Sequence, residues 1–533
     1  MSLISGCSSI RFFELEQRES EVSQQENAEL VELDGLYKLP THLVHNQCLT
    51  INKYSDVGNA LLAQCAQELL SRDDLSPSLK SYALTSYNSS ILNLMRLNQS
   101  KGARVKVAIE EKGEYLIVND IKVREKELIP SIYGELGVPI VVRESNSQQG
   151  LNKYYPAEGI YSSRTILFKS LKHDGQFITI KLSSHREKLT TIGKNYYPLK
   201  FSPGAAFLAL IENATIDDFS WLGFTNANQA EKRRGVFSIG DISKTKTPII
   251  MIHGLNSDPL IWRNLTMAIL NDKKIHEHFQ IWHVYYPSGP PPFFNAMRIR
   301  KQLKEFINDL GAPELYSRAV IIGHSMGGVI SRTLSTNSQD KLWNVTFTER
   351  YEDMDLKQDS SLKDIFVFSP IFEEATVFFL DTPHRGSNIA TSLIGSIGSA
   401  FVTLPDNFKN IFKRFIDRVG IEKITSAMQP FLVEHGPNSV QVLRPGHPLM
   451  EALVELPIQG ESYSIIGSNS KLICKHQVDC DQVSDGVVSY ESAYLEDAAD
   501  TIIVNSSHDS FRNPEATSFI LDKLKRKMNQ SSL

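Results

Sequence analysis

The stretch "AVIIGHSMGGVISR", residues 319–332, carries the strongest local pattern in the chain. Its first four residues favour a buried strand and its last five favour a helix. Between them lies Gly323-His324-Ser325-Met326-Gly327, a serine with a glycine two places away on each side. This arrangement is typical of a sharp strand-to-helix turn that lifts a serine hydroxyl out of a sheet. The pattern predicts that Ser325 is a nucleophile; an ordinary glycine-rich turn is the alternative.

A serine nucleophile that attacks a carbonyl needs two N–H donors for the developing oxyanion. The N–H of Met326, at the start of the following helix, can supply one. The stretch "PIIMIHGL" predicts a neighbouring strand that ends at His253-Gly254, and the N–H of the next residue, Leu255, can supply the second. A simple strand-end turn is the alternative for this stretch.

A serine also needs a base to take its proton and an acid to orient that base. "SYSIIGS" is an apolar run, and the loop after it contains Asp485 within "SDGVV". "DTIIVNSSH" ends at His508 and precedes a final helix-like segment. The chain order Ser325, Asp485, His508 is one that hydrolases with this kind of serine turn use. We therefore predict these three residues as nucleophile, acid and base.

Asp381, in "FFLDTPHRG", is a rival for the acid because it also ends a predicted strand. We favour Asp485 because it lies on the strand that directly precedes the histidine. The loop after Asp381 contains Arg385 and is interpreted as a structural turn with an arginine anchor. His324 is expected to point away from the serine side of the turn.

The fold class follows from short apolar runs after about residue 245 that alternate with helix-like segments. Runs such as "TPIIMIHG", "RAVIIGHS" and "ATVFFLDTP" are nearly continuous in apolar residues. Such runs, separated by helices, predict an α/β domain: a mostly parallel sheet with helices on both faces. Active sites of these sheets lie at the carboxyl ends of the strands, where the predicted site residues are found.

The N-terminal half of the chain has a different pattern, to which we assign no chemistry. The pattern predicts a polar tether over 1–34, a small helical region over 35–102 and a β-rich accessory domain over 103–240. The α/β domain is expected over 241–533.

Composition excludes several classes of protein. The chain of 533 residues has 41% hydrophobic and 22% charged residues and a net charge of −5, which gives no general attraction for nucleic acid. No run of 18 or more apolar residues is present, so no membrane-spanning segment is expected. The five cysteines include no Cys-x-x-Cys pair, and we predict no metal site and no cofactor.

Taken together, "PIIMIHGL", "VIIGHSMGG", "FFLDTPHRGS", "SDGVVSYESA" and "NSSHDSF" resemble the lipase-like branch of the α/β-hydrolases, with bacterial relatives of GPI inositol-deacylase as the best match. The likeness covers about 245–525. It implies the α/β-hydrolase fold, the nucleophile elbow Gly323, His324 and Gly327, the catalytic residues Ser325, Asp485 and His508, and oxyanion donors at Leu255 and Met326. Esterases, lipases, thioesterases and acyltransferases all share these features.

An insertion at about 387–455 is expected to form a helical cap or a mobile lid. In "DNFKNIFKRFIDRVG", helical spacing places Phe408, Ile411, Phe412, Phe415 and Val419 on one apolar face. Such a face can pack on the domain as a cap, or line an acyl site as a lid.

The cysteines bear on the compartment. Cys474 and Cys480 are predicted to form a disulfide just upstream of Asp485, and Cys48 and Cys65 are a second candidate pair. "ISGC", ending at Cys7, resembles a bacterial lipobox, in which the cysteine is lipidated; only six residues precede it, fewer than a signal needs. Together these features predict a lipoprotein of the bacterial cell envelope, anchored to a membrane surface; a cytoplasmic enzyme with free thiols is the alternative.

The sequence thus predicts a serine esterase that cleaves lipid or other acyl esters without a cofactor. An acyltransferase or thioesterase with the same three residues, and a non-catalytic envelope binding protein on this fold, stay open.

Overall fold

The computed structural model describes residues 12–16, 35–97, 105–173, 178–213, 227–354, 360–388, 404, 406–431, 438–469, 480 and 483–530. These residues form two compact units, which are described separately. The N-terminal unit comprises residues 1–145 and 158–213, and the C-terminal unit comprises residues 146–157 and 214–533.

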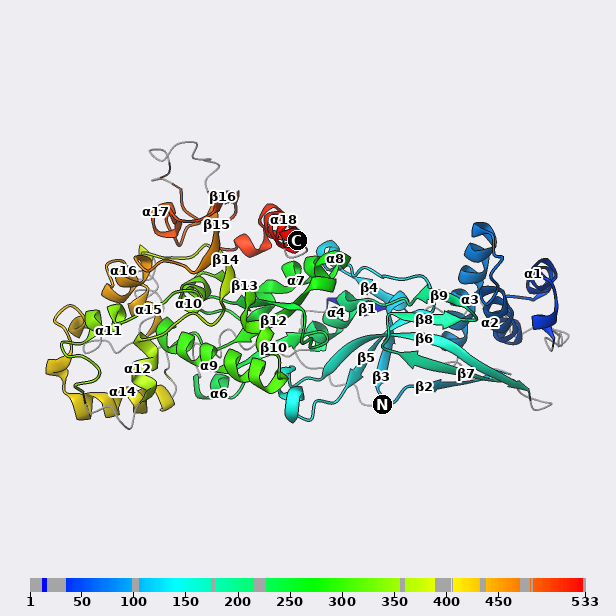
Figure 1. The fold of residues 1–533 in the computed structure, drawn as a ribbon, viewed down its shortest axis with the longest axis horizontal. Helices are drawn as coiled ribbons and strands as arrows, with labels where there is room; N and C mark the ends of the chain where they lie inside the picture. Colours follow the sequence, from blue (N-terminus) through cyan, green and yellow to red (C-terminus); the bar gives the residue numbers. More distant parts are fainter. Residues whose placement is uncertain are drawn as a thin grey trace. The chain divides into compact units, whose positions relative to one another are not determined.

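The C-terminal unit is built on a seven-stranded sheet of order β10-β12-β11-β13-β14-β15-β16 (Figure 1). The edge strand β10 is antiparallel to β12, and every other neighbouring pair is parallel. The parallel strands therefore all end at one edge of the sheet. The strands are β10 (Gly235–Ile239), β11 (Thr247–Ile252), β12 (Phe279–Tyr285), β13 (Arg318–His324), β14 (Glu374–Leu380), β15 (Gly460–Ser468) and β16 (Asp500–Asn505).

Helices cover both faces of this sheet because its strands are apolar on both faces. Ile250 and Ile252 of β11 belong to the large core that includes helices α9 and α10, whereas Met251, between them, contacts Thr266 of α7. The helices of this unit are α6 (Ala227–Glu231), α7 (Arg263–Leu270), α8 (Lys273–His278), α9 (Pro292–Leu310), α10 (Met326–Leu334), α11 (Lys341–Thr346), α12 (Ser360–Phe366), α14 (Asp406–Val419), α15 (Ser439–Val442), α16 (Pro448–Val454), α17 (Tyr490–Ala493) and α18 (Pro514–Gln530).

The N-terminal unit has a five-stranded sheet of order β2-β7-β6-β5-β3, with helices packed against it. One core holds apolar residues of both the helices and the strands, including Leu69, Ile91, Ile140 and Ile180. Its elements are β1 (Phe13–Leu15), α1 (Thr41–Thr50), α2 (Asp56–Leu70), α3 (Pro77–Leu97), β2 (Val105–Glu110), β3 (Glu114–Ile117), β4 (Ile121–Val123), β5 (Val138–Glu144), β6 (Ile160–His173), β7 (Ile178–His185), β8 (Leu189–Ile192), β9 (Asn195–Pro198) and α4 (Pro203–Asn213).

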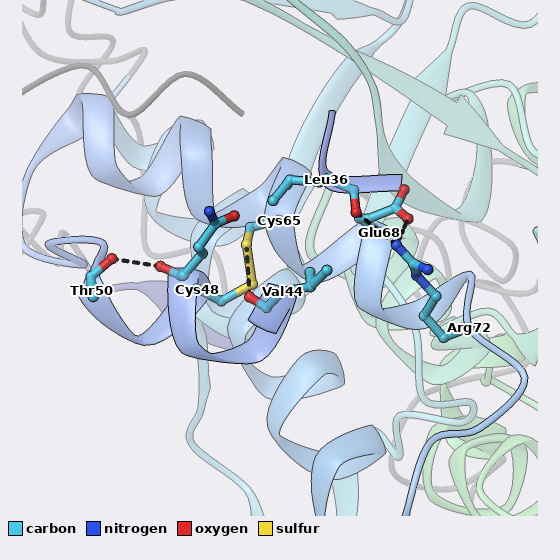
Figure 2. Close-up of a disulfide and its surroundings, with 8 residues drawn as sticks. Leu36, Val44, Cys48, Thr50, Cys65, Glu68 and Arg72 are labelled. Atoms are coloured by element: carbon cyan, nitrogen blue, oxygen red, sulfur yellow. Dashed lines mark hydrogen bonds and ion pairs between the residues drawn. A yellow bond between two sulfur atoms is a disulfide. The ribbon is translucent and has the colours of Figure 1, made fainter. Parts of the chain in front are cut away.

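A disulfide joins Cys48 of α1 to Cys65 of α2, with their Cα atoms 5.7 Å apart (Figure 2). Both cysteines are buried. Nearby, Arg72 donates a 2.8 Å hydrogen bond to the carbonyl of Leu36 and pairs with Glu68. The helical layer is therefore held by a covalent link as well as by its apolar core.

The structure differs from the expected domain boundaries in three places. The helical region predicted over 35–102 and the strands that follow it share one core, so they form one unit. Strand β10 belongs to the C-terminal sheet, so that domain starts before the expected residue 241. Residues 146–157, expected within the β-rich domain, belong to the C-terminal unit, where Tyr154 stacks on Phe306 of α9 with ring centroids 3.9 Å apart.

Candidate active site

Ser325 occupies a one-residue turn between β13, which ends at His324, and α10, which begins at Met326. Its backbone has φ 54° and ψ −125°, a conformation that L-residues other than glycine rarely adopt. The surrounding fold holds this strain, and the result is a serine at the carboxyl end of a central strand. This is the sharp turn that the sequence predicted.

Close backbone approach explains the glycines around the serine. A Cβ atom at Gly327 would collide with the carbonyl oxygens of Ile252 and His253, at the end of β11. A Cβ atom at Gly323 would overlap the carbonyl of Gly327 across the turn. Helix α10 can therefore pass this close to the sheet only with glycine at both positions.

The side chains of Ser325, His508 and Asp485 lie in hydrogen-bond contact. The Nε2 atom of His508 is 2.9 Å from Oγ of Ser325, and its Nδ1 atom is 2.6 Å from Oδ2 of Asp485. Ser325 follows β13, Asp485 lies in the loop after β15, and His508 lies in the loop after β16. His508 is 183 residues from Ser325 and 23 residues from Asp485 in the chain. A neutral imidazole with its proton on Nδ1 donates to Asp485 and leaves Nε2 free to accept the serine proton.

Backbone donors hold Asp485 in position. Its Oδ1 atom accepts hydrogen bonds from the N–H groups of Val487 and Val488, each 2.7 Å long, which leaves Oδ2 for His508. The carboxylate is 3% exposed, so these bonds are shielded from water. The sequence "SDGVV" thus forms a tight turn that presents one oxygen of the carboxylate to the imidazole.

The electrostatics of this site favour a proton on His508. Burial disfavours its charged form, but the hydrogen bond and charge of Asp485, with the charges of Asp381 and Asp509, raise the pKa of His508 above its ordinary value. A histidine with a raised pKa accepts a proton from a hydroxyl more readily than an unperturbed one.

The two predicted oxyanion donors lie beside the serine. Met326 is the first residue of α10, and Leu255 follows Gly254, whose Cα is so near the serine that a Cβ atom there would lie 2.9 Å from Cβ of Ser325. Among the described residues, and apart from bonds within regular helices and strands, neither N–H donates a hydrogen bond to a backbone carbonyl. Their role as oxyanion donors therefore stays a prediction.

Residues that sequence reasoning missed fix the turn before Leu255. The ring of Tyr286 stacks on His253 with centroids 4.3 Å apart, and its hydroxyl donates a 2.6 Å hydrogen bond to the His253 carbonyl. The N–H of Asn256 donates to Oγ of Ser288 at 3.0 Å. Burial lowers the pKa of His253 to about 4, so this histidine is a neutral packing group. The run "YYPS", residues 285–288 at the end of β12, gave no local signal of this role.

Asp381, the rival acid, lies close to the site but does not hydrogen-bond His508. Its carboxylate accepts instead from the N–H groups of Gly467 and Ser510. Arg385, in the loop after it, donates to the carbonyls of Glu491 and Tyr494, as expected of an arginine anchor.

The expected orientation of His324 is wrong. Its ring lies beside that of His508, with the two ring centroids 4.8 Å apart, and edge-on to Phe511. The turn brings the end of β13 close to the loop after β16, so His324 packs against His508.

One group of potential metal ligands occurs among the described residues. Atoms of His324, Asp381 and His508 lie within 4.8 Å of one another. Both ring nitrogens of His508 are already bonded to Ser325 and Asp485, so this group belongs to the serine site.

The described part of the expected insertion at 387–455 contains the helices α14, α15 and α16, with turns between them. Phe408 of α14 is buried and meets Phe294 edge-on, with ring centroids 4.7 Å apart. Cys7 and Cys474 lie outside the described residues, and so do the lipobox and the Cys474–Cys480 pairing. Among the described residues, no helix is both long and apolar enough to cross a membrane.

The strand order, the single antiparallel edge strand and the serine turn after β13 define the α/β-hydrolase fold. No family model and no curated protein matches the chain. Among solved structures, it is similar to the mature lipase BlEst2 of Bacillus licheniformis, with 15% identity, a TM-score of 0.32 and 54% of this chain and 97% of that chain covered. It is also similar to an α/β superfamily hydrolase of Oenococcus oeni, with 17% identity, a TM-score of 0.26 and coverage of 54% and 96%.

Proposed function

We propose that this protein is a serine hydrolase that cleaves carboxylic esters through an acyl-enzyme. The observation that carries the proposal is the continuous hydrogen-bonded chain from Asp485 through His508 to Ser325 at the carboxyl edge of the sheet. In this arrangement an otherwise weak hydroxyl nucleophile has a base within reach and an acid that orients the base.

In the proposed reaction Nε2 of His508 takes the proton of Ser325 as Oγ attacks the ester carbonyl. The N–H groups of Leu255 and Met326 bind the oxyanion of the tetrahedral intermediate. Collapse of this intermediate breaks the bond to the alcohol, which leaves with the proton from His508. Water, deprotonated by His508, then attacks the acyl-enzyme. His508 returns this proton to Oγ of Ser325 as the acyl–Oγ bond breaks and the acid leaves. Asp485 stabilises the imidazolium at both stages.

The proposal is tested by Ser325→Ala, with Ser317→Ala as the matched control. Ser317 directly precedes β13 and Ser325 directly follows it, so the two serines flank the same strand. Loss of a nucleophile of this kind lowers kcat by on the order of a millionfold. We expect Ser325→Ala to lose hydrolysis of chromogenic esters and labelling by a fluorophosphonate probe, and Ser317→Ala to keep both.

Ester hydrolysis retained by Ser325→Ala would contradict the proposed nucleophile. If the wild-type protein reacts with the probe but transfers the acyl group of an ester only to an added alcohol and not to water, it is an acyltransferase. Failure of the wild-type protein to react with the probe would favour a binding role for the fold.

The substrate we propose is a lipid or other ester with a medium or long acyl chain. The motif resemblance to bacterial relatives of GPI inositol-deacylase and the apolar pattern of α14 in the insertion support this choice. Each methylene buried in an apolar site contributes about 0.8 kcal/mol. In a series of chromogenic esters, we expect kcat/KM to rise from acetyl to octanoyl; a steady fall along the series would contradict an acyl-binding insertion.

We also propose that the protein works in an oxidising compartment, the bacterial cell envelope, tethered to a membrane surface through Cys7. The Cys48–Cys65 disulfide supports this location, because reducing compartments keep thiols free. Thiol counting on denatured, unreduced protein isolated from its native cells tests the idea: alkylation of both Cys48 and Cys65 in that sample would contradict it.

A further inference from the structure

The carboxylate of Asp381 lies where three elements of the site meet. Asp381 directly follows β14 and is 1% exposed. Its Oδ1 atom accepts a 2.8 Å hydrogen bond from the N–H of Gly467 in β15, and its Oδ2 atom accepts a 3.0 Å bond from the N–H of Ser510. Ser510 follows His508 by two residues, so one buried carboxylate ties the loop of the histidine to two neighbouring strands.

Asp381 also brings a second charge to the imidazole. Its carboxylate lies within 4.8 Å of a ring nitrogen of His508. His324 approaches the same carboxylate, with its Nε2 atom 3.7 Å from Oδ2, but burial holds the pKa of His324 well below its ordinary value, so it stays neutral. His508 is thus flanked by two carboxylates, Asp485 in direct hydrogen bond and Asp381 farther away.

Gly467 of β15 leaves room for both Asp381 and Asp485. A Cβ atom at Gly467 would lie 3.0 Å from Oδ1 of Asp381 and 3.0 Å from Cβ of Asp485. Such contacts are tighter than side chains normally make, so glycine at this position lets both acids approach the same point of the sheet.

We infer that Asp381 is a positioning residue of the proposed hydrolase, which anchors the His508 loop to the sheet and stabilises the His508 imidazolium with its charge. The inference rests on the proposed function, since it assigns a second acid to the same site. Asp485 remains the hydrogen-bond partner of the histidine, because both oxygens of Asp381 are engaged by backbone N–H groups.

Asp381 carries its charge only above its own pKa, which its surroundings raise. Burial and the charge of Asp485 raise the pKa of Asp381 to about 6, against the attraction of His508. The titratable groups that face Asp381 are His324 from β13, Asp485 after β15 and His508 after β16. Asp509 adds its charge to the surroundings of His508. Above that pKa the ionised carboxylate favours the imidazolium, so removing it should lower the pKa of His508.

The pH dependence of kcat/KM for a chromogenic ester, measured on Asp381→Asn, tests the inference. Asp381 has φ 48°, a left-handed conformation that asparagine tolerates well. Asp500→Asn is the matched control, because Asp500 is a surface carboxylate at the start of β16, paired with Lys523 at 2.7 Å.

We expect the acidic limb of the Asp381→Asn profile to move to lower pH by about one unit. We also expect kcat to fall about tenfold to a hundredfold with KM little changed, because the base loses its alignment. The limb of Asp500→Asn should stay at the wild-type position.

An acidic limb that does not move in Asp381→Asn would overturn the inference, whatever its effect on kcat, since a purely structural residue would give that result. If this variant does not fold, Asp381→Gly serves in its place, because glycine suits the same backbone conformation. A wild-type protein without esterase activity would instead refute the proposed function, so the two failures are distinguishable.

Discussion

At the scale of single residues, the candidate site contains a residue with a strained backbone, Ser325. Ser325 has φ 54° and ψ −125°, a region that only glycine enters freely. A strained residue of this kind destabilises a fold by roughly 1–3 kcal/mol. The strain persists because the N–H of Ser325 donates a 2.9 Å hydrogen bond to the carbonyl of Leu380, and the turn on either side is closely packed.

We therefore predict that Ser325→Gly stabilises the protein while removing the proposed esterase activity. Glycine relieves the strained φ and ψ, and the free energy of unfolding should rise by about 1 kcal/mol. Ser325→Ala keeps the strain and should leave stability near that of the wild-type protein.

Urea or thermal unfolding of the two variants, compared with wild type, measures the difference. Equal stability of the glycine and alanine variants would show that the turn stores no such strain.

At the scale of elements, the packing of α10 against β11 sets the position of the serine. Gly327 is the contact point, because only a hydrogen fits between its Cα and the carbonyls of Ile252 and His253. Those carbonyls belong to backbone at the end of a central strand, where little movement is available.

We predict that Gly327→Ala costs about 2–3 kcal/mol of stability and most of the proposed esterase activity, because α10 must shift away and take Ser325 with it. Gly446→Ala is the control: it also lies in the C-terminal unit and has φ 71°, but an added Cβ would meet no atom closer than 4.0 Å. It should cost about 1 kcal/mol through backbone strain alone and leave kcat unchanged.

Melting curves and ester hydrolysis on both glycine variants test this prediction. A Gly327→Ala protein with wild-type kcat would mean that the turn can absorb a methyl group without moving the nucleophile.

At the scale of the whole molecule, the Cys48–Cys65 disulfide and the candidate active site belong to different units. Cys48 and Cys65 are in the N-terminal unit and 17 residues apart, whereas Ser325, Asp485 and His508 are in the C-terminal unit with its own core. A disulfide that closes a loop of this length stabilises a fold by about 3 kcal/mol.

We expect the N-terminal unit of the paired variant Cys48→Ala/Cys65→Ala, made in the full chain, to unfold at a lower temperature than in the wild-type protein. We expect the variant to keep the proposed esterase activity at 25 °C. Calorimetry and ester hydrolysis on the same samples measure both effects. A thermal profile identical to that of the wild-type protein would show that the cross-link does not stabilise the N-terminal unit.

Local patterns were sufficient to single out three residues whose side chains the structure brings together, because each follows an apolar strand. The strand "AVII" followed by GHSMGG, and the late stretches "SDGVV" and "SSH", indicated Ser325, Asp485 and His508 before any contact was known. The nearly continuous apolar runs likewise indicated the parallel sheet, since strands buried on both faces are apolar throughout.

Tertiary structure alone decided which carboxylate meets the histidine and what surrounds it. Asp381 and Asp485 both follow strands, and sequence reasoning could only rank them; the distances put Asp485 on His508 and Asp381 on the backbone of Gly467 and Ser510. The place of His324 and the assignment of β10 also lay beyond the sequence. The physical reason is that strand order and side-chain contacts join residues far apart in the chain, and local composition carries no record of those pairings.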